Sequence, residues 1–127
     1  MFPLDMRSNK PIYEQIIDNI KEQTVKGILK PQDKLPSVRQ LAAMLTVNPN
    51  TVSKAYAELE RQKVIETIRG RGTFVCALGE LQVDGEKLEQ SKKKLKDVCI
   101  EMSYLGLDKE EILKEVETIF KGLQKEV

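Results

Sequence analysis

The alternation of apolar and polar positions is most regular between Ser37 and Lys63. In this stretch, one set of apolar residues recurs at intervals of three and four, which places it on one face of an α-helix: Val52, Ala55, Tyr56 and Leu59. A shorter set with the same spacing precedes it: Val38, Leu41, Ala42 and Leu45. The pattern predicts two short helices joined by a tight turn, each packing one face against a core.

The start of the second of these helices is marked by its own residues. Asn48 suits the N-cap, and Pro49 suits the first helical position, where no hydrogen-bond donor is lost. The other polar side chains gather in the N-terminal half of the helix: Asn50, Thr51, Ser53 and Lys54. Short donors and acceptors at the positive end of a helix suit phosphates and base edges. Any surface helix has a polar face, but the flanking elements favour a nucleic-acid site here.

A further helix is predicted upstream. Pro11 suits its first turn, Gly27 lies near its end and Pro31 stops its continuation. Its inward stripe consists of Ile12, Tyr13, Ile16, Ile17 and Ile20. The residues from Leu29 to Pro36 are predicted to form a loop, which delivers Ser37 as the N-cap of the next helix.

Three arginines are candidates for nucleic-acid contact. Arg39 falls on the outer face of its helix, where it could reach a phosphate or base edge or be an ordinary solvated arginine. After Lys63 the pattern changes, because two short β-prone runs, Val64–Ile68 and Thr73–Cys76, flank the string Arg69-Gly70-Arg71-Gly72. This predicts a β-hairpin whose arginines could enter a minor groove or bind backbone phosphates. The alternative is a loop of solvated arginines.

The C-terminal part of the chain is predicted to form two amphipathic helices. Leu81, Leu88, Leu95 and Met102 are spaced by seven, and Val98 and Leu105 adjoin them. Gly106 is expected to end the first helix, and Asp108 with Glu111 resembles a capping box for the second. The inner face of the second is Ile112, Leu113, Val116, Ile119, Phe120 and Leu123.

A two-helix hairpin of this length is too small to bury both apolar stripes. We therefore expect a second copy of the chain to cover them. The residues expected at that dimer interface are Leu88, Leu95, Val98, Met102, Leu105, Ile112, Val116, Ile119, Phe120 and Leu123. The alternative is that the hairpin folds back onto the N-terminal domain.

Charge and composition narrow the function. The net charge of +1 conceals an asymmetry, because residues 1–76 have 12 Lys or Arg against 8 Asp or Glu, whereas residues 77–127 have 9 against 12. A basic front part favours nucleic-acid contact there, although an uneven scatter of solvated charge would look the same. The chain contains no histidine and no catalytic motif, so we expect no enzyme activity, no catalytic residue and no cofactor.

Cysteine spacing and hydropathy argue against a metal site and a membrane-spanning segment. Cys76 and Cys99 lack metal-site spacing and are expected to be small buried side chains, so no metal site is predicted. No apolar run is long enough to span a membrane and no signal-peptide pattern is present. We therefore expect a cytoplasmic protein with no membrane partner.

The string LPSVRQLAAMLTVNPNTVSKAYAELE, followed by IRGRGTFV, resembles the winged helix-turn-helix domain of GntR-family transcription regulators. The resemblance covers about Lys10 to Cys76. It implies DNA contacts by Arg39, Asn48, Asn50, Thr51, Ser53, Lys54, Arg69, Gly70 and Arg71. Gln32 and Lys63 depart from the family pattern, because both stand where glycine is usual. Either Lys63 has a left-handed conformation, at a cost on the order of 1 kcal/mol, or the helix ends differently.

The short helical tail resembles the YtrA subfamily, which implies a compact dimeric repressor, often of a transporter operon. The expected fold is mainly α with a small β wing: a winged helix-turn-helix domain (1–76), a linker (77–85) and a two-helix dimerisation region (86–127). The expected partners are a near-palindromic double-stranded DNA operator and a second copy of the chain. The residues identify no operator, regulated gene or small-molecule effector. The competing hypothesis is a winged-helix adaptor for protein contacts without specific DNA binding.

Overall fold

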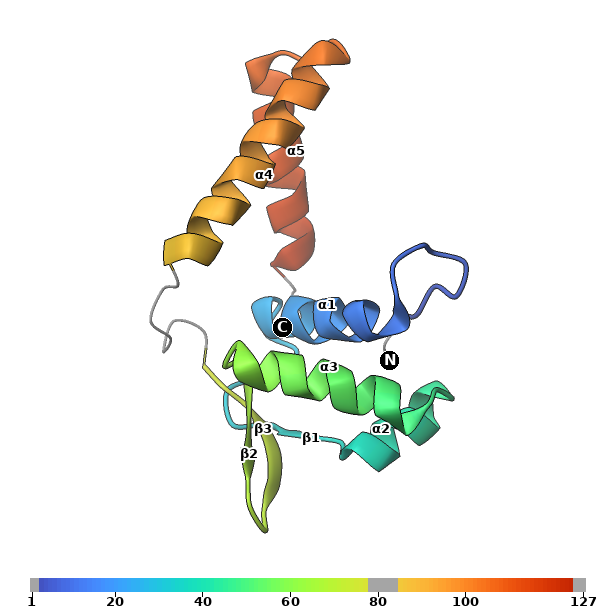
Figure 1. Ribbon diagram of the computed structural model, residues 1–127. Helices are drawn as coiled ribbons and strands as arrows, with labels where there is room; N and C mark the ends of the chain where they lie inside the picture. Colours follow the sequence, from blue (N-terminus) through green and yellow to red (C-terminus); the bar gives the residue numbers. More distant parts are fainter. Residues whose placement is uncertain (1–2, 78–84, 125–127) are drawn as a thin grey trace. The chain divides into compact units, whose positions relative to one another are not determined.

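The computed structural model describes residues 3–77 and 85–124, and its elements follow in the order α1, β1, α2, α3, β2, β3, α4, α5 (Figure 1). Contacts along the chain divide it near residue 80 into two compact units. The first unit contains α1 to β3, and the second contains α4 and α5. No helix in the described ranges is long and apolar enough to cross a lipid bilayer.

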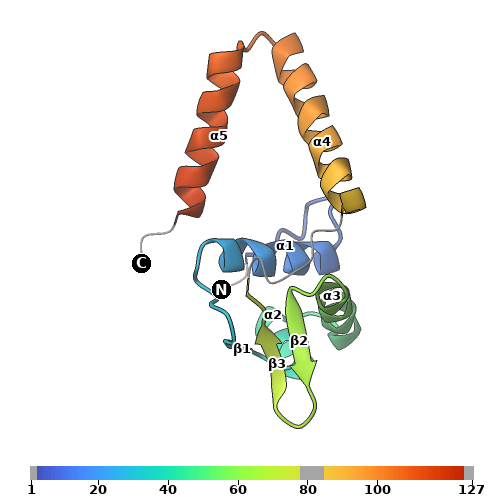
Figure 2. The ribbon, with the colours of Figure 1, turned by 90° about the vertical axis from the view of Figure 1, so that its left-hand side faces the viewer.

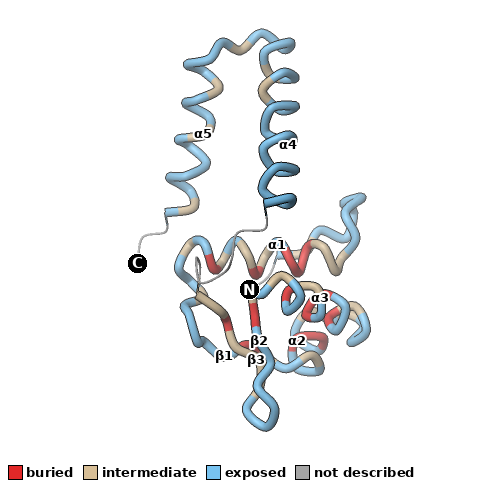
Figure 3. Tube along the Cα trace, turned by 60° about the vertical axis from the view of Figure 1, so that its left-hand side comes forward, coloured by how far each residue is buried: buried red, intermediate tan, exposed pale blue. Residues whose placement is uncertain are grey.

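The first unit is built on three helices, α1 (Ile12–Val25), α2 (Val38–Leu45) and α3 (Pro49–Arg61). All three were predicted from the apolar spacing and are confirmed. Buried positions lie along each helix and on the adjoining strands (Figure 3). The core that they form consists of Ile16, Ile17, Ile20, Leu35, Leu41, Ala42, Val52, Ala55, Tyr56, Leu59, Ile65 and Val75.

A three-stranded antiparallel sheet completes this unit. Strand β3 (Gly72–Val75) lies in the middle, between β1 (Lys34–Leu35) and β2 (Ile65–Ile68). The β2–β3 hairpin was predicted, but the interpretation of Leu29 to Pro36 as a loop was wrong in part. Two of its residues pair with β3, Lys34 opposite Phe74 and Leu35 opposite Thr73, because the buried Leu35 side chain draws this backbone against the sheet.

Within residues 3–77 and 85–124, three residues other than glycine have positive φ: Gln32 at 71°, Thr46 at 57° and Lys63 at 61°. Gln32 and Lys63 are the two positions where the sequence departs from a usual glycine. Of the two helix endings left open at Lys63, the structure has the left-handed one. The Lys63 N–H donates to Glu60 O at 2.9 Å, so the conformation closes the end of α3.

The second unit consists of α4 (Gly85–Tyr104) and α5 (Lys109–Leu123), antiparallel helices joined by a turn that contains Gly106. Gly106 has a φ of 105°, and Asp108 forms the predicted capping box with Glu111. Figure 2 shows the two helices diverging away from this turn. Neither helix has a buried residue, so the part of this unit that the structure describes forms no buried core in one copy of the chain.

The structure differs from the sequence-based expectation at the linker boundary and at the two cysteines. Gly85, which was assigned to the linker, is the first residue of α4, whereas residues 78–84 of that linker, including Leu81, lie outside the described residues. Cys76 and Cys99 were expected to be buried but are only half-buried, because Cys76 lies just beyond β3 and Cys99 lies on the uncovered α4.

Candidate nucleic-acid interface

The start of α3 is fixed by the Asn48 side chain. Its Oδ1 accepts a hydrogen bond from the Asn50 backbone N–H at 2.8 Å, as an N-cap does, and Pro49 follows at the first helical position. The amide nitrogen of Asn48 is then the donor that it can offer to a ligand. Asn50 and Ser53 are exposed and Thr51 is half-buried, so this end of α3 presents short polar side chains to solvent.

Helix α2 brings Arg39 to the surface in its first turn. A capping box fixes this end of the helix, because the Gln40 N–H donates to Ser37 Oγ at 3.1 Å and the Ser37 N–H donates to Gln40 Oε1 at 2.9 Å. The side chain of Arg39 is exposed. Its backbone is therefore fixed by the box, while its guanidinium group extends into solvent.

The hairpin tip is shaped by glycine. Gly70 has a φ of 81° and Gly72 a φ of 122°, and the Arg71 N–H donates to Ile68 O at 2.9 Å, which closes the turn. Arg69, Gly70 and Arg71 are all exposed. The tip extends beyond the three helices of its unit (Figure 1), so both guanidinium groups are carried away from the core.

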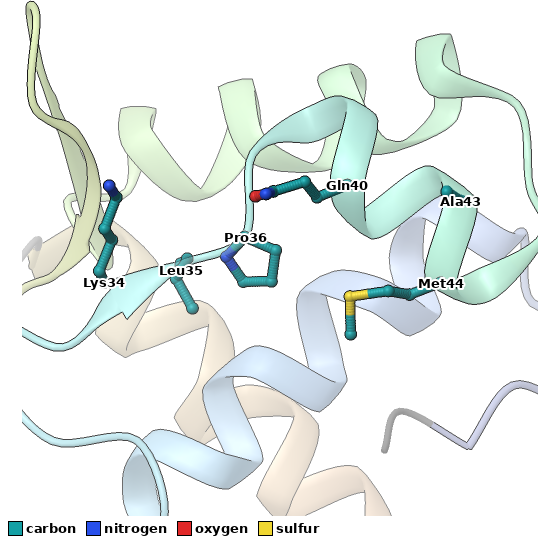
Figure 4. A pocket seen from close by; sticks show the side chains of 6 residues that line it. All are labelled: Lys34, Leu35, Pro36, Gln40, Ala43 and Met44. Atoms are coloured by element: carbon teal, nitrogen blue, oxygen red, sulfur yellow. The ribbon is translucent and has the colours of Figure 1, made fainter.

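Lys34 adds a cation to the hairpin that the sequence pattern did not indicate. It is exposed on β1, and a Cβ added at Gly72 would lie only 2.8 Å from its Cε. The stem of Lys34 therefore passes over the bare backbone of Gly72. Figure 4 shows Lys34 lining a hollow between β1 and α2, with Gln40 across from it. Only the pairing of β1 with β3 brings Lys34 next to the hairpin. A strand of two residues is too short to be predicted from the local sequence pattern.

Lys54 makes a contact that helical periodicity alone does not give. Its Nζ lies 4.0 Å from the centre of the Tyr13 ring on α1, which is a cation–π geometry. Tyr13 was predicted to be a core residue, and its ring does pack against the core, but it is only half-buried. The exposed edge of α3 is thus joined to α1 through Lys54.

Positive charge predominates around the start of α3. Between Asp33 and Glu58 the chain contains no acidic residue, a stretch that includes β1, α2 and most of α3. Glu58 is bound by Arg61, whose Nε donates to Glu58 Oε1 at 3.0 Å. The nearest carboxylate on α3 is therefore neutralised at the C-terminal half of the helix, away from its polar start.

Tyr56 fixes α3 to the residues before α2. Its hydroxyl group donates to Pro36 O at 2.7 Å, and burial raises its pKa to about 12. The ring is thus neutral at physiological pH and serves as a support rather than as a titrating group. Because Pro36 joins β1 to Ser37, this hydrogen bond sets the spacing between α3 and the strand that carries Lys34.

Taken together, two helices joined by a tight turn, a glycine-tipped hairpin and a polar helix start in a stretch without acidic residues define a winged helix-turn-helix DNA-binding protein. Comparison with known families gives the narrower assignment. Residues 12–75 match the family described as "Bacterial regulatory proteins, gntR family". The chain is also 48% identical to the HTH-type transcriptional repressor YtrA of Bacillus subtilis, over 98% of both chains. It belongs to the GntR family of transcriptional regulators and is not an enzyme.

Solved structures agree with this assignment. A protein from Listeria monocytogenes described as a transcriptional antiterminator superposes with a TM-score of 0.91 and 43% identity, and the match covers 100% of this chain and 96% of that one. The DNA-binding domain of AraR in complex with its operator ORR3 matches 58% of this chain and 89% of that domain, with a TM-score of 0.51 and 30% identity. The winged helix-turn-helix fold is therefore shared with a protein solved on DNA.

Proposed function

We propose that this protein is a homodimeric repressor that binds a near-palindromic operator through α3 and the hairpin tip. The observation that carries the proposal is the exposure of the polar start of α3, within residues 34–57 that contain no Asp or Glu, together with two exposed arginines on a glycine tip. In this proposal the N-terminal half of α3 enters the major groove, and the tip lies in the adjacent minor groove or along the backbone.

The side chains divide by chemistry. Arg39, Lys54 and Arg71 carry charge and would hold phosphates, which sets affinity and its salt dependence. Asn50 would pair with a base edge, since an exposed amide can both donate and accept a hydrogen bond. The remaining proposed DNA contacts would orient the protein on the duplex or lie next to the phosphate- and base-binding side chains. They are Asn48, Thr51, Ser53, Arg69 and Gly70.

The uncovered second unit supports dimerisation. Six of the ten residues expected at the interface are exposed, with Leu105 at 73% and both Leu95 and Ile119 at 58%. The other four, Met102, Ile112, Val116 and Leu123, are half-buried. Fully burying one leucine contributes roughly 1.5–3 kcal/mol, so several such residues per copy favour association. A two-fold dimer would place two copies of α3 about one helical turn of DNA apart.

The direction of regulation is proposed from the relatives. The similarity to YtrA, a repressor by name, supports repression. The resemblance to the YtrA subfamily extends the proposal to a transporter operon as the regulated genes. A regulator of chromosomal genes acts where the chromosome lies, so the cytoplasmic location expected from the sequence is part of this proposal.

Selection of bound duplexes from random DNA tests the DNA-binding part directly. We expect a near-palindromic site, bound more weakly by Lys54→Ala and Arg71→Ala, each lowering the salt slope by about 0.9. Asn50→Ala should relax base choice at one position of each half-site. Lys114→Ala on α5 is the matched control, because it removes one exposed lysine from the second unit.

Two results would contradict the DNA-binding proposal. If wild-type protein enriches no sequence, the adaptor hypothesis replaces it. If all three variants bind the selected duplex like wild type at several salt concentrations, the assigned surface is wrong.

Sedimentation tests the dimer. Leu95→Glu and Phe120→Glu place a carboxylate on the two apolar rows, and we expect both variants to be monomers with weak operator affinity. Gln90→Glu on α4 adds the same charge at an exposed polar position and should remain dimeric. Intact dimers in both test variants would remove the second unit from this role.

A further inference from the structure

The contact between Tyr13 and Lys54 joins two elements with different tasks. Tyr13 lies on α1, where its half-buried ring packs against the core of the first unit. Lys54 lies on the exposed side of α3, two residues after the buried Val52. The ammonium group lies 4.0 Å from the ring centre. A side chain with four rotatable bonds is therefore held over a ring that the core keeps in place.

We propose that Tyr13 is a positioning residue for DNA binding, which holds the Lys54 ammonium group over its ring so that the group meets a backbone phosphate already oriented. The proposal rests on the proposed function, because it assigns Lys54 to a phosphate. It gives α1 a part in recognition, whereas the sequence indicated only an inward-facing apolar stripe on that helix.

The chemistry of the ring explains why it positions the lysine without competing for it. The face of a tyrosine ring attracts a cation through its quadrupole, yet it does not occupy the ammonium N–H donors as a carboxylate would. Those donors stay available to phosphate oxygens. A carboxylate at the same place would instead neutralise the charge and weaken attraction to DNA.

Positioning also reduces the entropy lost on binding. A free lysine samples many rotamers, and fixing them against a phosphate opposes association. Part of that ordering is already present when the ammonium group lies on the ring. The ring also displaces some hydration water from one side of the ammonium group, which makes the remaining electrostatic attraction stronger than in bulk water.

Nuclear magnetic resonance of the free protein tests the geometry without DNA. Methylene protons above an aromatic face experience a ring current, so we expect the Lys54 Hε signals to be shifted upfield in wild type. Tyr13→Leu should abolish this shift and Tyr13→Phe should keep it, since phenylalanine has the same ring face. Unshifted Lys54 Hε signals in wild type would overturn the proposal.

A double-mutant cycle on the selected operator duplex tests the function. We expect Tyr13→Leu to weaken binding about two- to fivefold, the usual range for an exposed cation–π pair. The same change in a Lys54→Met background should have no effect, because the lysine to be positioned is gone. Tyr13→Phe should restore binding to within about twofold of wild type. Thermal unfolding of each variant shows whether the fold is retained.

The outcomes separate this inference from the proposed function. Equal weakening by Tyr13→Leu in both backgrounds would mean that the ring only supports the fold, and would overturn the inference while operator binding by wild type stands. No weakening by Lys54→Met would do the same. Failure of wild-type protein to select any duplex would overturn both.

Discussion

Replacing Lys63 by glycine should stabilise the protein. The residue has a φ of 61°, and its N–H donates to Glu60 O at 2.9 Å while the Val64 N–H donates to Leu59 O at 2.9 Å. These two bonds form the closing motif that glycine usually completes at the end of a helix. A left-handed residue with a Cβ costs roughly 1–2 kcal/mol. Glycine removes that cost, but it gives the unfolded chain more conformational freedom, which lowers stability by about 0.5–1 kcal/mol. The net increase in the free energy of unfolding should therefore be about 0.5–1 kcal/mol.

Urea unfolding measures this gain. Lys63→Gly should raise the urea midpoint without changing the m-value, because the folded structure and its buried surface stay the same. Lys63→Ala is the matched control, since it removes the same exposed side chain but keeps the Cβ. The reasoning is refuted if Lys63→Gly is no more stable than Lys63→Ala. Operator affinity should be unchanged in both, because the hairpin that follows keeps its position.

Three further predictions concern the hairpin, the core and the tail. Gly72→Ala should destabilise the first unit by about 1–2 kcal/mol, because φ is 122° and the new methyl group would clash with Lys34 Cε. Adding Lys34→Ala should remove the clash but leave the backbone strain. Urea unfolding of the single and double variants measures both effects. Tyr56 has a pKa of about 12 in the folded protein and about 10 when unfolded, so stability is unaffected below pH 10 and falls as the pH rises from 10 to 12. Denaturation at pH 8 and 11 should show a larger loss for wild type than for Tyr56→Phe. Asp108→Ala should lower the helicity of the tail, measured by circular dichroism, because it removes an N-cap that contributes about 1 kcal/mol.

The helices were predictable because their signals are local. Spacing of three and four residues fixed the buried stripes of α1, α2 and α3, and the caps at Ser37, Asn48 and Asp108 lie within three residues of the groups they bind. Positive φ at Lys63 was one of two endings that the sequence left open, because many helices, but not all, close with a left-handed residue. None of these features depends on contacts between distant segments.

The remaining features depend on such contacts. Strand β1 has two residues and forms only because Leu35 is buried against the sheet. Two residues are too few to show the alternation of apolar and polar positions that predicts a strand. The proximity of Lys34 to Gly72 follows from that pairing. The contact of Lys54 with Tyr13 joins positions 41 residues apart in the sequence. Helical periodicity predicts which face of a helix a residue lies on, but not which residue of another helix it contacts. For this reason the sequence identified Lys54 as a candidate but missed Tyr13.

The two units differ in where their stability originates, and this difference connects assembly with DNA binding. The first unit has a core of twelve buried residues in one chain, whereas α4 and α5 have none among the residues described. Isolated helices of this length are marginal in water, so the second unit gains its apolar burial through the proposed dimer. Its helicity should therefore fall on dilution while the first unit stays folded. One winged helix would read only a half-site, and in the proposed dimer the interface that folds the tail also joins the two DNA-binding domains. Operator affinity should therefore fall over the same concentration range.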